Sequence, residues 1–454
     1  MRRIMLLLAP LLLAAPARAA GDDHDKLLSW WVQLRPGGAE EARAVVDGPA
    51  CPLIVSFKGA EERTDAPMTM RAAASADFPM VCSGPVPADA HWSFIAMDKV
   101  QGDGFQFELR HAEASAALIR IDPTYMLPGL RPDPQRILVL GDTGCRLKDS
   151  LVQACNDPKQ WPFAGLAAAA AKLRPDLVIH VGDYLYRETP CPDGNAGCAG
   201  SPSGDNWASW SADFFAPGAP LLHAAPWVIV RGNHEDCARS APGFMRVLGP
   251  EPYDGSCPTH LKTYDVPLQG LNLRVMDNAD APDTSVDPSV VPEYAADFAA
   301  LANAPTPTWL VMHRPIWAAI KGPLGIPVGG NQTMIAALAG KPIPPPVSLM
   351  LAGHIHAFET LNYKDSAPPT LLAGNGGDLL DDPPSDLKGT IFQRGDVSVK
   401  DGLSVPGFGF LLMTRHGTDW EIDLFDAAGT FERRCMLAGG RIDCPAPPAE
   451  KKDG

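Results

Sequence analysis

The chain has 454 residues, 46% of them hydrophobic, and a formal net charge of −15 at pH 7. This length is sufficient for two or three domains with a substantial buried core. The acidic balance disfavours non-specific binding to nucleic acid or to anionic membrane surfaces, so we expect neither as a partner. It also repels anionic substrates, so a site for such a substrate needs local positive charge, for example from bound metal.

The first 19 residues predict a secretory signal peptide. Arg2 and Arg3 give a positive start, residues 4–15 are apolar, and Ala17-Arg18-Ala19 has the spacing of small residues found at cleavage sites. A membrane anchor is the alternative, but the apolar run is shorter than the about 20 residues that a bilayer span needs. No later stretch of the sequence is long and apolar enough for a span. We therefore expect an exported mature protein, either periplasmic or secreted.

All ten cysteines lie after this segment and fall into near neighbours along the chain. An even count in an exported protein indicates disulfides. Connectivity does not follow from sequence, but short loops favour pairing Cys51 with Cys82, Cys145 with Cys155, Cys191 with Cys198, Cys237 with Cys257, and Cys435 with Cys444. Metal ligation by cysteine is the alternative, and the chain has no close Cys-x-x-Cys pair to support it.

Residues 20–132 are predicted to form a small N-terminal β-rich domain and a linker. The segments 53–57, 68–71 and 105–110 alternate apolar and polar residues, as half-buried strands do. The stretch 122–134 contains four prolines and a glycine, a composition typical of linkers.

The region 133–444 is predicted to be an α/β domain, because apolar strand-like runs alternate with helical segments. Helices are expected at residues 163–173, 207–223, 294–302 and 332–338, and antiparallel strands at 408–414, 420–425 and 430–435. The segment 188–206 is rich in Gly, Pro and Cys and is predicted to be a loop. Residues 445–454 are expected to be a disordered tail.

Five apolar runs in this domain each end directly before residues that can bind metal. Asp142 follows the run 136–140, Asp183 and Tyr186 follow 176–181, Asn233 and His234 follow 226–230, His313 follows 308–312, and His354 and His356 follow 347–352. Residues just past the carboxyl ends of buried strands occupy the place where open α/β sheets build their sites. We therefore expect these side chains to meet.

The residue types together favour a centre with two metal ions. Carboxylates are hard ligands that can bridge two cations, and imidazoles suit iron, zinc and related metals. Asn233 offers a neutral carbonyl oxygen, and Tyr186 offers a phenolate if a strongly charged cation lowers its pKa. Seven candidate ligands are more than one metal needs, so two metals that share a carboxylate are the economical interpretation. Such a pair, about 3.5–4 Å apart, clamps the attacking and leaving oxygens of an in-line displacement.

The order of these motifs resembles that of the calcineurin-like metallophosphoesterases. It runs Gly-Asp-x-Gly, Gly-Asp-x-x-Tyr, Gly-Asn-His-Glu, a single histidine after a strand, and then Gly-His-x-His. The wider superfamily has a histidine two residues after the first aspartate, whereas this chain has Gly144 there and Tyr186 three residues after Asp183. This coupled change is typical of the purple acid phosphatase branch.

The resemblance implies a calcineurin-like four-layer α/β/β/α sandwich and a role for each candidate residue. It implies that the first metal is held by Asp142, Asp183, Tyr186 and His356, and the second by Asp183, Asn233, His313 and His354. It also implies Fe(III) in the tyrosine-bound site and Fe(II), Zn(II) or Mn(II) in the other. His234 would face the phosphate and help to protonate the leaving group.

Three departures from the family pattern concern the expected leaving-group pocket. Trp317 stands where the family usually has tyrosine, Phe358 replaces a second tyrosine, and no histidine occurs between His313 and His354. Arg314 and Lys321 are candidates for a contact with the substrate phosphate, with a surface role as the alternative.

These features predict an exported phosphoester hydrolase that acts on a phosphorylated small molecule. The resemblance favours a phosphomonoesterase, with a phosphodiesterase on the same metal site as the close rival. A non-catalytic module that binds metal or phosphate is the alternative from a different class. The irregular loops 188–206, 236–262 and 318–330 are expected to select the substrate.

Overall fold

The computed structural model describes residues 26–58, 62–97, 125–321, 327–364, 367–384, 386–390 and 397–445. The predicted signal peptide at 1–19, the predicted strand at 105–110 and the predicted tail from residue 446 onward lie outside the described residues. Within the described ranges, no helix is both long and apolar enough to cross a membrane.

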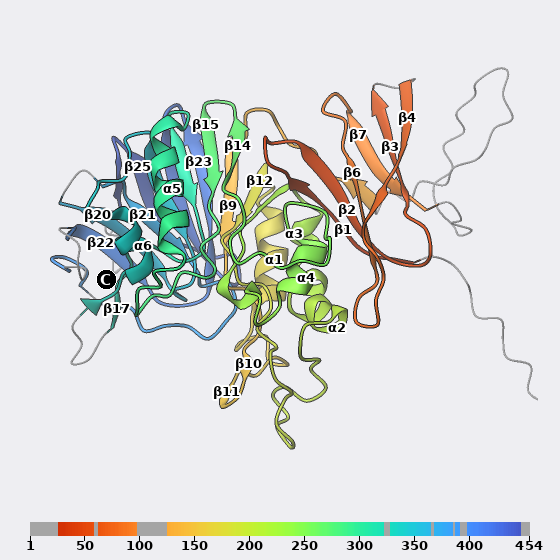
Figure 1. Cartoon of the computed structure of the whole chain (residues 1–454), viewed down its shortest axis with the longest axis horizontal. Helices are drawn as coiled ribbons and strands as arrows, with labels where there is room; N and C mark the ends of the chain where they lie inside the picture. The colour runs from red at the N-terminus through yellow and green to blue at the C-terminus, as the bar shows by residue number, and fades with distance from the viewer. Residues whose placement is uncertain are drawn as a thin grey trace, which may run out of the picture.

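Two large β-sheets form the centre of the molecule (Figure 1). Among the described residues, the larger sheet has eleven strands in the spatial order β26 (Arg441–Asp443), β25 (Phe431–Ala438), β24 (Asp419–Asp426), β23 (Gly409–His416), β9 (Arg136–Leu140), β12 (Leu177–His180), β13 (Trp227–Ile229), β1 (Lys26–Leu34), β2 (Glu40–Asp47), β6 (Met80–Pro85) and β5 (Thr69–Ala72). The smaller sheet, counted in the same way, has seven strands in the order β14 (Tyr264–Leu268), β15 (Leu271–Val275), β16 (Thr308–Val311), β19 (Val347–Ala352), β21 (Thr370–Ala373), β20 (Phe358–Tyr363) and β22 (Val399–Val405). The antiparallel strands predicted near the C-terminus are confirmed as β23, β24 and β25.

The strands that precede the candidate ligands are parallel and buried. β9, β12 and β13 are parallel neighbours in the larger sheet, and β16 and β19 are parallel neighbours in the smaller one. Every residue of β12 and of β16 is buried, as expected for parallel strands that are covered on both faces. Within each sheet, the carboxyl ends of these strands therefore lie along the same edge.

Helices cover the outer face of each sheet and complete four layers. The larger sheet is covered by α1 (Phe163–Lys172), α2 (Trp207–Trp210), α3 (Ala216–Leu222) and α4 (Ala241–Val247), and the smaller sheet by α5 (Val291–Ala300) and α6 (Gln332–Leu338). Figure 1 shows α5 and α6 on the side of the molecule away from the N-terminal strands. The inner faces of the sheets pack together through side chains such as Val139, Ile179, Leu273 and Val311. This arrangement confirms the expected α/β/β/α sandwich.

Helix α1 follows directly from its residue pattern. Phe163, Leu166, Ala167 and Ala170 are buried, and their spacing places them on one stripe of an amphipathic helix. Alanine has the highest helix propensity, and the helix ends before Pro175 because proline lacks the N–H that the helical ladder needs. The buried stripe packs on β9 and β12, the strands that carry the first two ligand motifs.

The four predicted helices are present, α6 with the predicted bounds and the other three with shifted or divided spans. The segment 207–223 is divided into α2, a π-helical turn (Ser211–Phe215) and α3, and the segment 294–302 overlaps α5. Helix α4 lies in the segment 236–262, where the sequence predicts no helix. The helix is missed because Pro242 and Gly243 are residues typical of loops. A Cβ at Gly243 would lie 2.1 Å from Trp210 Nε1, so packing against α2 requires glycine.

Smaller elements are β10 (Leu147–Lys148), β11 (Leu151–Val152), β17 (Ile320–Lys321), β18 (Pro327–Val328) and the 3-10 turns Asn233–Glu235 and Leu301–Asn303.

The N-terminal strands extend the larger sheet. β1 is parallel to β13, where Gln33 lies opposite Trp227, and β2 pairs with both β1 and β6. A further sheet packs on this extension and consists of β4 (Glu62–Pro67), β3 (Leu53–Lys58), β7 (Trp92–Ala96) and β8 (Met126–Leu127). The N-terminal region is therefore rich in β-structure. Its boundary with the α/β domain stays a prediction, although strands from both sides of that boundary share one sheet.

All five expected cysteine pairs are disulfides in the structure, and they are Cys51–Cys82, Cys145–Cys155, Cys191–Cys198, Cys237–Cys257 and Cys435–Cys444. The second, third and fourth of these lie in the segments that follow the first three ligand motifs. Such cross-links reduce the conformational freedom of long loops.

Candidate metal centre

The side chains predicted from the five strand ends are brought together between the two sheets. Asp142 follows β9, Asp183 follows β12, Asn233 follows β13, His313 follows β16, and His354 follows β19. All are buried except His354, whose side chain is 20% exposed. The parallel arrangement of the strands is the reason that residues more than 200 positions apart can meet here.

Three of these residues have backbone conformations that non-glycine residues rarely adopt. The φ angles of Asp142, Asp183 and His354 are 56°, 58° and 70°. The left-handed region is most accessible to Asp, Asn and His among non-glycine residues. Such strain persists only where the surroundings enforce it, and it clusters at functional sites.

A first group of donor atoms surrounds the Tyr186 hydroxyl. Its Oη lies 3.0 Å from Asp142 Oδ1, 2.9 Å from Asp183 Oδ2 and 3.1 Å from His356 Nε2. Neighbouring ligands at right angles around a metal with bonds of about 2.1 Å are separated by about 3.0 Å. The spacing of these four residues therefore fits one metal ion.

A second group of donor atoms surrounds His313. Its Nε2 lies 3.1 Å from Asp183 Oδ2 and 3.0 Å from Asn233 Oδ1. Asp183, His313 and His354 each bring one possible ligand atom to within 4.8 Å of the others. The same oxygen, Asp183 Oδ2, thus contacts both groups, which is the position that a bridging carboxylate would take.

Backbone carbonyls orient two of the imidazoles. His313 Nδ1 lies 2.8 Å from the Val181 carbonyl oxygen, and His356 Nδ1 lies 2.6 Å from that of Leu379. A carbonyl accepts only, so each Nδ1 carries the proton and donates it. The lone pair of each Nε2 is therefore left for a metal ion, as is usual for histidine ligands.

The electrostatics of the cluster favour a bound cation. Burial raises the pKa of Asp183, but His313 and His234 outweigh this effect and hold its pKa well below the usual range. Burial lowers the pKa of His313, but the Asp183 carboxylate outweighs it and raises that pKa to about 9. Burial, together with Asp142 and Asp183, raises the pKa of Tyr186 well above its usual value. A phenolate at Tyr186 therefore needs a strongly charged cation beside it, which the donor set around its hydroxyl can hold.

His234 lies against this cluster. Its backbone N–H donates to Asp183 Oδ1 at 2.8 Å, and its ring centroid is 3.9 Å from that of Tyr186. Its Nδ1 lies 2.7 Å from Glu188 Oε1, although the approach is too bent for a well-formed hydrogen bond. Burial lowers the pKa of His234. Glu188 is a residue that sequence reasoning missed, because it begins a segment interpreted only as a loop.

Other residues around the centre were also not predicted from sequence. The Arg146 guanidinium lies 4.8 Å from the centroid of the Tyr186 ring and pairs with Asp378. Asp378 Oδ2 in turn lies 3.5 Å from His356 Nδ1. Asp378 follows the apolar strand β21, so the strand-end pattern could have found it. Arg146 has no such signal.

One expectation about the surrounding pocket is corrected. Trp317 is only 4% exposed and packs in the core between the smaller sheet and its helices, beside Tyr363, so it does not line the leaving-group pocket. Lys321 pairs with Asp382 at the surface, whereas Arg314 lies beside His354.

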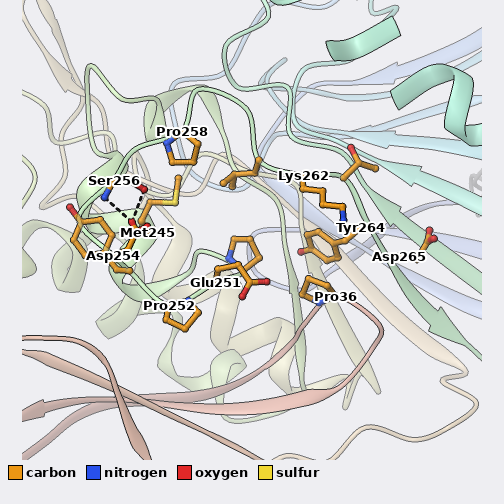
Figure 2. A pocket seen from close by; sticks show the side chains of 14 residues that line it. Pro36, Met245, Glu251, Pro252, Asp254, Ser256, Pro258, Lys262, Tyr264 and Asp265 are labelled. Carbon is orange, nitrogen blue, oxygen red and sulfur yellow. Dashed lines mark hydrogen bonds between the residues drawn. The ribbon is translucent and has the colours of Figure 1, made fainter. Parts of the chain in front are cut away.

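Two of the cavities among the described residues differ in their relation to the centre. One of about 410 Å³ is bounded by His354 and by Pro315, Ala318, Ile320 and Gln332. The other, of about 550 Å³, lies between the turn at Pro36 and the loop that leads into β14, and Figure 2 shows Glu251, Lys262 and Tyr264 around it. None of the candidate ligands lines the larger cavity, so we assign it no part in the chemistry.

Two solved structures share this fold at low sequence identity. A purple acid phosphatase isolated from yellow lupin (Lupinus luteus) seeds aligns with a TM-score of 0.57 and 12% identity, over 89% of this chain and 73% of that chain. PhoD aligns with a TM-score of 0.51 and 11% identity, over 93% of this chain and 92% of that chain. Among curated protein sequences, none matches this chain.

A family comparison identifies the part of the chain that carries the centre. The sequence profile of the calcineurin-like phosphoesterases matches residues 135–358. This range includes the ends of the five strands that precede the candidate ligands, and it includes every candidate ligand. This stretch of the chain is a calcineurin-like phosphoesterase domain, and the protein is a metal-dependent phosphoester hydrolase.

Proposed function

We propose that the protein is an exported phosphomonoesterase with two metal ions, similar to the purple acid phosphatases. The observation that carries this proposal is the position of Asp183, whose Oδ2 contacts both the Tyr186 hydroxyl and His313 Nε2. One carboxylate shared by two donor sets is what a pair of adjacent cations needs. The combination of Gly144 with Tyr186 supports the purple acid phosphatase branch.

The proposed ligands divide into two sets around Asp183. Asp142, Tyr186 and His356 complete the first set, and Asn233, His313 and His354 complete the second. A phenolate together with carboxylates suits Fe(III), while two imidazoles and an amide oxygen suit Fe(II), Zn(II) or Mn(II). When bound, two such cations supply Lewis acidity that activates water and neutralises the charge developing on the phosphate.

His234 is proposed to donate a proton to the leaving oxygen. Its ring packs against the Tyr186 ring, and its Nδ1 lies within ion-pair distance of Glu188 Oε1, at 2.7 Å. The Glu188 carboxylate is itself anchored by Lys148 at 3.0 Å. A histidine held in this way presents Nε2 for proton transfer in a fixed direction.

The cavity beside His354 supports hydrolysis of an ester with an organic group. A cavity of about 410 Å³ falls in the size range of small-molecule sites. Ala318, Ile320 and Gln332 in its wall carry no charge. The five disulfides support the proposed export, because such bonds persist in oxidising compartments.

The test compares rates on a chromogenic phosphate monoester and on the matching diester, using metal-replete protein whose iron and zinc content is measured. We expect two metals per chain and faster turnover of the monoester. His354→Ala should lose one metal and activity, whereas His416→Ala, a change at an exposed histidine, should lose neither. Full activity in His354→Ala would overturn the assignment, and preferential turnover of the diester would replace the monoesterase with a phosphodiesterase.

A further inference from the structure

The Nε2 atom of His354 is contacted by an aspartate that lies outside all the ligand motifs. Asp283 belongs to the segment between β15 and α5, 71 positions before His354 in the chain. Its Oδ2 lies 2.9 Å from His354 Nε2. The Asp283 side chain is 33% exposed, and it lines the cavity of about 410 Å³ together with His354.

The surroundings of His354 decide which ring nitrogen can face a metal. The Arg314 guanidinium contacts Asp283 Oδ2, and its Nη1 lies 3.4 Å from His354 Nε2. A metal ion on Nε2 would therefore meet a fixed positive charge within a few ångströms, which is unfavourable. Nδ1 is the remaining nitrogen, and His354 is one of the residues that bring a ligand atom close to Asp183 and His313.

We propose that Asp283 is a positioning residue that sets the tautomer of His354. Its carboxylate accepts the Nε2 proton, so the Nδ1 lone pair is left to bind the second metal. His313 is oriented by a neutral backbone carbonyl, whereas His354 is oriented by a carboxylate. A carboxylate partner makes the imidazole a stronger metal ligand. This inference rests on the proposed two-metal function and adds a residue on which retention of the second metal depends.

Asp283 is itself held in place from the opposite side. Asn331 Nδ2 donates to Asp283 Oδ1 at 2.8 Å, and the backbone N–H of Gln332 donates to the Asp283 carbonyl at 3.0 Å. The Asn331 side chain also accepts from the Met334 N–H at 2.8 Å and so caps α6. The carboxylate is therefore fixed to the start of a helix, and its direction toward His354 is determined by the fold.

The experiment measures metal retention in full-length Asp283→Ala and Asp283→Asn proteins. The proteins are loaded with Fe(III) and Zn(II) and dialysed against graded free zinc, and both metals are then counted per chain. We expect zinc to dissociate about 10–100-fold more readily from Asp283→Ala. The zinc retention of Asp283→Asn should fall between that of the wild-type protein and that of Asp283→Ala, because the amide oxygen still accepts the Nε2 proton but carries no charge. Iron content and the visible absorption of the tyrosine-bound iron should stay unchanged in both.

The matched control is Asp287→Ala, which removes a carboxylate from the same segment. Asp287 Oδ1 accepts hydrogen bonds from the backbone N–H and the hydroxyl of Ser289, and it contacts no candidate ligand. We expect its zinc retention to equal that of the wild-type protein. Zinc held as tightly by both Asp283 variants as by the wild-type protein would overturn the inference, and Asp283→Asn decides the matter if Asp283→Ala does not fold. A wild-type protein that binds only one metal would instead overturn the proposed function.

Discussion

At the scale of single residues, the glycines of the motifs are as restrictive as the ligands beside them. A Cβ at Gly232 would lie 2.0 Å from Asp183 Oδ1 and 2.1 Å from the Asp183 backbone nitrogen. A Cβ at Gly182 would lie 2.4 Å from His313 Nδ1, and its φ of 104° is itself unfavourable for other residues. These glycines let two backbones approach closely enough for the ligands to meet.

We therefore predict that Gly232→Ala weakens metal binding although no ligand residue is replaced. The added methyl group must displace Asp183, the proposed bridge, and we expect metal affinity to fall by at least about tenfold. Overpacking should also cost about 1–3 kcal/mol of stability. Both effects are measured by metal titration and by thermal unfolding.

The control for this prediction is Gly165→Ala in α1. A Cβ at Gly165 would meet no atom within 4 Å, and alanine in a helix stabilises by about 0.5–1 kcal/mol relative to glycine. Metal affinity should be unchanged in this variant. If Gly232→Ala behaved like Gly165→Ala, the close approach would have no role in forming the centre.

At the scale of secondary-structure elements, β20 is joined to its surroundings by a buried carboxyl group. Glu359 is fully buried, and its Oε2 accepts from the Ala319 N–H at 3.1 Å while its Oε1 lies 3.4 Å from Ser404 Oγ. Burial raises the pKa of Glu359 to about 8. The folded protein therefore holds this proton more tightly than the unfolded chain, in which the group has an ordinary pKa of 4.5.

This shift predicts how stability depends on pH. The contribution of neutral Glu359 is complete below about pH 4.5 and is lost as the pH rises to about 8, since the buried carboxyl must then ionise. Glu359→Gln keeps an acceptor for Ala319 and cannot ionise. We expect it to match the wild-type protein at pH 5 and to exceed its stability by a few kcal/mol at pH 9, at about 1.4 kcal/mol per pKa unit. Thermal unfolding of both proteins across this range at constant metal concentration is the measurement, and a difference independent of pH would contradict the prediction.

At the scale of the whole molecule, the N-terminal strands and the catalytic domain form one structure. Arg43 in β2 is fully buried, and its guanidinium donates to the Val247 carbonyl at 2.8 Å and the Gly249 carbonyl at 2.9 Å. Its Nε donates to Glu41 Oε1 at 2.8 Å. These contacts satisfy carbonyls at the end of α4, the helix that follows the His234 motif.

We predict that Arg43→Met destabilises the entire protein. The change leaves the Glu41 carboxylate and two buried carbonyls without this partner, which should cost about 3–5 kcal/mol. Arg63→Met is the matched control, because Arg63 also pairs with a carboxylate two residues away, Asp65, but on a partly exposed strand. Its loss should cost about 0–1 kcal/mol. Equal melting temperatures for the two variants would mean that the N-terminal strands fold independently of the catalytic domain.

Much of the centre could be predicted from local sequence. Five apolar runs placed Asp142, Asp183, Asn233, His313 and His354 at strand ends, because parallel strands buried on both faces leave continuous apolar segments in the sequence. The disulfide pairs were also predictable, since short loops close at low entropic cost. Whether each of these residues binds metal remains a prediction.

The sequence by itself determined the α/β character of the chain and the strand ends that bear donor side chains, and it favoured the cysteine pairs, because these depend on residue type and short-range spacing. Only the tertiary structure decided that Asp283 contacts His354, that Arg146 lies over Tyr186, and that the N-terminal strands extend the catalytic sheet. Trp317 became a core residue for the same reason. Such contacts join segments far apart in the chain, and no local pattern records which distant surface a side chain will meet.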